Sequence, residues 1–70
     1  MKKYWMSAAP VNCDWCGSKI GKTFVDGKTT TGQWGCLCPS CHKKMGGRLG
    51  TGLGQQYEKQ ADGKWLKTKG

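Results

Sequence analysis

The chain has few of the side chains that catalysis needs. It contains one histidine and four acidic residues among 70 positions. A general acid and base would have to be drawn from a single set: Asp14, Asp26, Glu58, Asp62 and His42. None of these is spaced as a recognisable catalytic constellation. We therefore predict that the protein is not an enzyme and that it has no small-molecule substrate.

Apolar residues are also sparse. They make up 36% of the chain, and residues 1–7 lack the apolar stretch of a secretory signal peptide. We expect a cytoplasmic protein with reduced thiols and no membrane partner.

A hydrophobic core formed from so short a chain gives only marginal stability, so a metal or disulfides often supply the remaining stability.

The cysteines offer that stability. Cys13-Asp14-Trp15-Cys16 and Cys38-Pro39-Ser40-Cys41 are two C-x-x-C pairs separated by 21 residues, which is close to the spacing of structural zinc sites. Four thiolate ligands leave no coordination position for water, so such a metal is a folding element. We predict one structural Zn²⁺ ion bound by Cys13, Cys16, Cys38 and Cys41.

Alternatives to this ligand set stay open. The odd number of cysteines, five, and the lack of a signal-peptide stretch argue against a disulfide framework. Residues 38–42 also match the C-x-x-C-H pattern of c-type haem attachment, which would leave the first pair without a role. Cys36 could replace Cys38, although the two-residue spacing favours Cys38, and Cys36 otherwise packs as a small hydrophobe. We interpret His42 as a surface residue or one just outside the ligand sphere, with a ligand role as the alternative.

Turn signals organise the rest of the chain. The apolar Tyr4-Trp5-Met6 segment is compatible with an edge strand. Gly17 is free to adopt a positive φ after the first cysteine pair. Asp26-Gly27 lies between β-forming residues and predicts a hairpin turn, and Asp62-Gly63, between Tyr57 and Trp65, predicts a second one.

The second cysteine pair introduces a helix. Residues 42–45 predict one or two helical turns, with Pro39 near the first, and Gly46-Gly47 ends them. The glycine-rich segment 46–54 follows. We interpret it as a mobile loop or one that folds closely over the zinc centre, in preference to a phosphate-cradling nest.

A tight turn that carries the first cysteine pair (a zinc knuckle), a hairpin, and a second cysteine pair at the start of a short helix form the treble-clef arrangement. We predict a small metal-stabilised α+β fold, a treble-clef-like zinc finger with a C-terminal β-hairpin. A zinc ribbon, in which both pairs lie on hairpin knuckles, is the alternative because the helix is so short. The predicted organisation is an N-terminal lead-in over 1–12, one zinc-binding domain over 13–67 and a tail over 68–70.

Between Cys13 and Tyr57 the chain resembles short zinc-finger-like proteins encoded by bacteriophages and prophages. The resemblance lies in Cys13-Asp14-Trp15-Cys16-Gly17, Phe24-Val25-Asp26-Gly27-Lys28-Thr29, Trp34, Cys38-Pro39-Ser40-Cys41-His42 and Gly50-Thr51-Gly52-Leu53-Gly54-Gln55. It implies a viral origin and a metal-binding domain in the cytoplasm of a bacterial host. It does not imply a defined activity.

Charge gives the main indication of function. Twelve Lys and Arg residues against four acidic ones give a formal charge of +8, which falls to about +6 when four thiolates bind one Zn²⁺. Basic residues follow both cysteine pairs: Lys19, Lys22, Lys43, Lys44 and Arg48. If both pairs bind one metal, these clusters lie near each other and form a surface that attracts nucleic-acid phosphates. A single arginine argues against sequence-specific readout.

The same positive net charge is compatible with a second class of partner, a protein. A basic domain also binds an acidic groove on a protein. The alternative prediction is therefore a regulator that attaches to a host machine such as RNA polymerase.

Overall fold

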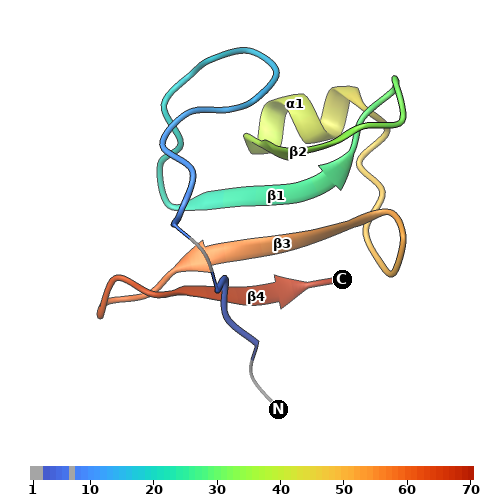
Figure 1. Ribbon diagram of the computed structural model, residues 1–70. Helices are drawn as coiled ribbons and strands as arrows, with labels where there is room; N and C mark the ends of the chain where they lie inside the picture. The colour runs from blue at the N-terminus through green and yellow to red at the C-terminus, as the bar shows by residue number, and fades with distance from the viewer. Residues whose placement is uncertain (1–2, 7) are drawn as a thin grey trace.

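The computed structural model describes residues 3–6 and 8–70, and within them the chain forms one antiparallel sheet and one short helix (Figure 1). The elements in chain order are β1 (Thr23–Lys28), β2 (Trp34–Leu37), α1 (Pro39–Lys44), β3 (Gly54–Lys59) and β4 (Trp65–Lys69). The strands lie in the order β2-β1-β3-β4. The predicted small α+β fold is confirmed at this level.

The central pair of the sheet joins the two hairpins. β1 pairs with β3, so that Phe24 lies opposite Tyr57 and Gly27 lies opposite Gly54. The hairpins are therefore parts of one four-stranded sheet, and the pairing between residues far apart in the chain creates a common core.

The first hairpin turn is not where the sequence predicts it. Asp26 and Gly27 lie inside β1, and the turn spans residues 29–33. There the Thr29 N–H donates to the Gln33 carbonyl oxygen at 2.8 Å, and Gly32 has φ +88°. Gly27 is buried within the sheet, where it pairs with Gly35 of β2 and Gly54 of β3.

The C-terminal hairpin turn agrees with the prediction. The Gln60 N–H donates to the Lys64 carbonyl oxygen at 2.7 Å, and Gly63 has φ +88°. The N-terminal segment lies along the outer edge of β4, where the Trp5 N–H donates to the Trp65 carbonyl oxygen at 2.9 Å. This pairing agrees with the edge-strand interpretation of the segment.

The core has two parts on opposite faces of the sheet. Val25 lies opposite Leu37, and Leu37 is packed with cysteines of the two pairs. Phe24, the neighbour of Val25, points to the other face because side chains alternate along a strand. There it stacks on Tyr57 with ring centroids 5.3 Å apart. Trp5, Ile20 and Trp65 complete this aromatic cluster.

No helix among the described residues is both long enough and apolar enough to cross a bilayer.

Candidate metal centre

The first cysteine pair lies at the tip of a small hairpin formed by residues 11–20. The Ile20 N–H donates to the Val11 carbonyl oxygen and the Cys13 N–H donates to the Ser18 carbonyl oxygen, both at 2.8 Å. Gly17 donates to the Cys13 carbonyl oxygen at 3.0 Å and has φ +76°, as predicted. This turn directs both thiols of the pair to one side.

The second cysteine pair lies where β2 passes into α1. Cys38 is the N-cap residue, with extended backbone angles, and Pro39 begins the helix. Cys41 lies one turn later and is buried. Since the backbone changes from strand to helix at Cys38, this pair is not on a hairpin turn.

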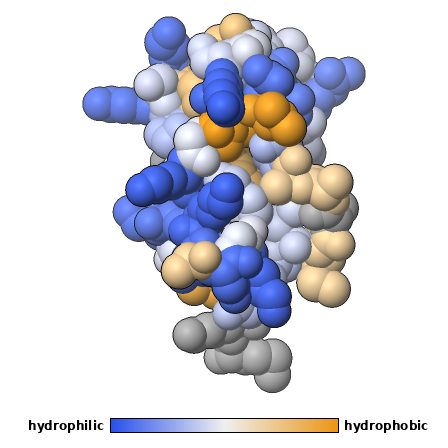
Figure 2. All heavy atoms as spheres, turned by 90° about the vertical axis from the view of Figure 1, so that its left-hand side faces the viewer, coloured by the Kyte–Doolittle hydropathy of each residue, from blue (hydrophilic) through white to orange (hydrophobic). Residues whose placement is uncertain are grey.

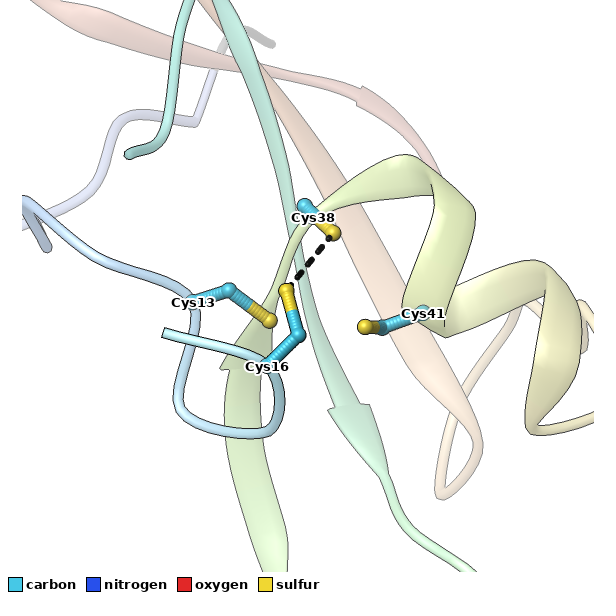
Figure 3. A group of neighbouring side chains, drawn as sticks. All are labelled: Cys13, Cys16, Cys38 and Cys41. Carbon is cyan, nitrogen blue, oxygen red and sulfur yellow. Dashed lines mark hydrogen bonds between the residues drawn. The ribbon is translucent and has the colours of Figure 1, made fainter. Parts of the chain in front are cut away.

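The four cysteines meet at one place. The sulfur atoms of Cys13, Cys16, Cys38 and Cys41 all lie within 4.8 Å of one another, and those of Cys16 and Cys38 are 3.8 Å apart. Figure 3 shows the four side chains pointing into a common space from the hairpin tip and the start of α1. The arrangement is a possible metal site with four thiolate ligands.

The pKa values of these thiols show why such a group favours a cation. Hydrogen bonds from Ser18 lower the pKa of Cys16 to about 6. Burial, followed by hydrogen bonds with the other cysteines, raises the pKa of Cys41 to about 12. Because burial of several thiolates is costly, full deprotonation of the cluster requires a compensating positive charge. A bound metal supplies it.

Cys36 lies outside this group. Its side chain packs against the aromatic cluster. Burial, together with the charges of Asp26 and Asp14, raises the pKa of Cys36 to about 11. The structure thus brings Cys38, not Cys36, to the other three cysteines, as the C-x-x-C spacing predicts.

Asp14 connects the two cysteine pairs, a role that sequence analysis missed. Its N–H donates to the Cys36 carbonyl oxygen at 2.9 Å, and its Oδ2 accepts a hydrogen bond from the Cys36 N–H at 2.8 Å. A Cβ at Gly35 would lie 3.3 Å from Cβ of Asp14. Asp14 therefore holds the first hairpin against the strand that leads into the second pair.

Of the two positions predicted for His42, the surface one is wrong. The side chain is buried, with 8% of its surface exposed, and it is not among the four grouped cysteines. Its Nε2 lies 2.7 Å from the carbonyl oxygen of Arg48. The ring links α1 to the glycine-rich segment.

The glycine-rich segment packs against the sheet. Gly50 and Gly54 exchange backbone hydrogen bonds of 2.8 and 3.0 Å, and Gly54 pairs with Gly27 of β1. Four glycines of the segment have positive φ: Gly46, Gly47, Gly50 and Gly52. These conformations let the chain turn tightly between α1 and β3.

The predicted basic residues are all exposed, and two of them, Lys22 and Arg48, line different hollows. Lys22 directly precedes β1 and, with Lys59, lines a hollow of about 220 Å³. Arg48 lines another hollow, of about 300 Å³, with Lys28 at the far end of β1. We call these the Lys22 hollow and the Arg48 hollow. Figure 2 shows hydrophilic side chains spread over the face that carries the β3–β4 turn, with a smaller hydrophobic patch among them.

Comparisons of the chain with protein-family models, curated proteins and solved structures found no match. The resemblance to short phage-encoded proteins stays a prediction, and so do the domain limits. Function is argued below from the geometry of the chain itself.

Proposed function

We propose that the protein is a structural-zinc module that binds nucleic acid through exposed Lys and Arg side chains, with little sequence specificity. The observation that carries the proposal is an asymmetry of charge: most cations project into solvent, whereas the carboxylates are engaged with the backbone or partly buried.

Zinc suits the sulfur cluster. With a Zn–S bond of about 2.3 Å, the edges of a regular ZnS₄ tetrahedron are about 3.8 Å long, and the sulfurs of Cys16 and Cys38 are 3.8 Å apart. Thiolate ligands favour zinc over hard cations such as Mg²⁺ and Ca²⁺. Four protein ligands leave no open position, which supports a structural role.

The order of elements supports a treble-clef-like arrangement. A cysteine hairpin is followed by the β1–β2 hairpin, and the second pair begins α1 at Cys38. A zinc ribbon would place the second pair on another hairpin turn, which does not suit the helical backbone from Pro39 onward.

The acidic side chains have local partners. Asp14 accepts a hydrogen bond from the Cys36 N–H, and Asp62 accepts one from the Lys64 N–H at 2.9 Å. Asp26 and Glu58 are half-buried. Among the described residues, the exposed cations come from most parts of the chain: Lys3, Lys19, Lys22, Lys28, Lys43, Lys44, Arg48, Lys59, Lys64 and Lys69. Phosphates approaching from solvent therefore meet mainly positive charge.

Low sequence specificity follows from the helix. α1 has six residues, and its N-cap and first turn carry two of the thiols. It is much shorter than a helix that reads bases in the major groove. Contacts to phosphates from flexible lysines would give affinity without base readout.

The test is a titration of the reduced, zinc-loaded protein with single- and double-stranded oligonucleotides at about 50 and 200 mM salt. We expect saturable binding whose affinity falls by orders of magnitude between the two salt concentrations. The triple variant of Lys43, Lys44 and Arg48 to alanine should bind more weakly while keeping its zinc and fold, because exposed substitutions rarely cost much stability. Absence of binding at the lower salt concentration would refute the proposal.

A protein partner is the second candidate. Trp15 and Trp34 are 52% and 45% exposed, and large exposed aromatics serve as anchors in protein interfaces. A basic regulator of a host machine such as RNA polymerase could use them. Since a complex with an apolar anchor persists at high salt, binding to purified polymerase at 200 mM salt, lost on Trp34→Ala, would favour this candidate.

A further inference from the structure

The Arg48 hollow lies at the end of β1, among three segments that are far apart in the chain. It has a volume of about 300 Å³, about ten times the volume of one water molecule in the liquid. The main lining residues come from the β1–β2 turn, α1 and the glycine-rich segment: Lys28, Thr29, Thr30, His42, Arg48 and Leu53.

Hydrogen bonds fix the walls of this hollow. The Lys28 N–H donates to the Leu53 carbonyl oxygen at 3.0 Å, which joins β1 to the glycine-rich segment. The His42 ring lies 2.7 Å from the Arg48 carbonyl oxygen and joins α1 to the same segment. Thr29 is bonded through both its N–H and its hydroxyl to the Gln33 carbonyl oxygen. The backbone around the hollow is thus organised before any ligand arrives.

The cations of the hollow are Lys28 and Arg48, and Met45 and Leu53 add apolar side chains to its lining. A Cβ at Gly46 would lie 3.9 Å from both Cγ and Nε of Arg48, so the arginine stem lies close to the backbone that ends α1. Its guanidinium supplies a planar set of N–H donors, and Lys28 supplies an ammonium group. No carboxylate is among the lining residues. A guanidinium and an ammonium group that line the same hollow are suited to phosphate oxygens.

We propose that the Arg48 hollow is a phosphate-binding subsite, in which Arg48 and Lys28 together hold one phosphate group. This inference rests on the proposed function in so far as the phosphate belongs to a nucleic-acid backbone. The chemistry is the same for a free phosphate ion, and the experiment separates the two sources.

The Lys22 hollow provides a matched control within the same molecule. It also contains two cations, Lys22 and Lys59, and it lies at the other end of β1. Removal of both cations changes the net charge by the same amount at either site. General electrostatic attraction predicts equal effects, whereas a defined subsite predicts unequal ones.

The experiment uses the zinc-loaded full chain and follows its backbone amide signals by NMR during titration with inorganic phosphate and, separately, with oligothymidylate. We expect both ligands to shift signals of residues 28–30 and 46–48 more than those of Lys22 and Lys59. Lys28→Ala with Arg48→Ala should weaken oligonucleotide binding about tenfold more than Lys22→Ala with Lys59→Ala, the equivalent of one charge-assisted hydrogen bond. Arg48→Lys should show an intermediate loss.

Each outcome of this experiment supports or refutes the phosphate-binding subsite. Equal loss in the two double variants, or phosphate shifts centred on the Lys22 hollow, would overturn the subsite. Phosphate shifts at the Arg48 hollow without any oligonucleotide binding would support the subsite and refute the proposed function. The zinc content and the dispersion of the remaining amide signals verify that each variant is folded.

Discussion

Removal of the Asp14 carboxylate should weaken metal binding although Asp14 is not a ligand. The carboxylate accepts the Cys36 N–H at 2.8 Å and thereby holds the first cysteine hairpin against the strand that ends at the second pair. Hydrogen bonds to charged groups contribute about 1.5–3 kcal/mol, and an exposed one lies at the lower end. About 1.5 kcal/mol corresponds to roughly a tenfold change in an equilibrium constant.

We therefore expect Asp14→Ala to lower the apparent zinc affinity about tenfold, as measured by competition with a chromophoric chelator at constant pH. Asp14→Asn keeps an acceptor oxygen but loses the charge, and its loss should be only about two- to threefold. The backbone bond from the Asp14 N–H to the Cys36 carbonyl oxygen remains in both variants.

Asp62 provides the control for general destabilisation. Its Oδ1 accepts the Lys64 N–H at 2.9 Å in the β3–β4 turn, outside the cysteine group. Because metal binding and folding are coupled in small metal domains, Asp62→Ala lowers the apparent affinity only through fold stability. An equal loss in Asp14→Ala and Asp62→Ala would refute the reasoning that Asp14 positions the cysteine pairs.

Four further predictions concern single positions. Replacement of Cys13, Cys16, Cys38 or Cys41 by serine should release the metal and abolish the dispersion of the amide NMR signals. Cys36→Ser should keep one metal per chain, as measured by mass spectrometry. Metal loss in Cys36→Ser would contradict the ligand set. The Cys36 thiol should react with iodoacetamide at pH 8 about 100-fold more slowly than an ordinary thiol. The reason is that its pKa is raised from 9.0 to about 11 and only the thiolate reacts. The same shift makes the folded state lose stability as pH rises above 9.0, because an unfolded chain releases this proton more readily there. His42→Ala should lower the free energy of unfolding by about 2–3 kcal/mol, because the hydrogen bond to Arg48 is lost and a cavity remains. One metal should still be bound. Loss of the metal with an intact fold would make His42 a ligand. Gly54→Ala should cost about 1–3 kcal/mol in thermal unfolding because its Cβ would lie 3.0 Å from the Arg48 carbonyl oxygen, whereas Gly21→Ala has nothing within 4 Å and should change stability little.

The cysteine grouping could be predicted from sequence because each C-x-x-C spacing is a local pattern, and two such pairs are typical of one shared metal site. Gly17 and the turn at Asp62-Gly63 were predicted for the same reason, since each depends on a few adjacent residues. Most of the features that agree between prediction and structure depend on such local patterns of adjacent residues.

The errors arose where distant residues decide the outcome. Asp26-Gly27 has the composition of a hairpin turn, yet it remains extended because β1 pairs with a strand on each side. His42 follows a cysteine of the cluster, and only the fold of the glycine-rich segment brings the Arg48 carbonyl oxygen within 2.7 Å of it. The separation of Lys22 from Arg48 likewise depends on which end of β1 each segment reaches.

The two outer strands have consequences for self-association. Exposed strand edges invite pairing with a second chain and so promote aggregation. Asp14 occupies hydrogen-bonding groups of Cys36 on the outer edge of β2, and the Lys3 carbonyl oxygen and the Trp5 N–H occupy those of Lys67 and Trp65 on the outer edge of β4. A second molecule that added a strand to either edge would first have to displace one of these segments. The hairpin that carries Cys13 and Cys16 thus also covers part of the outer edge of β2.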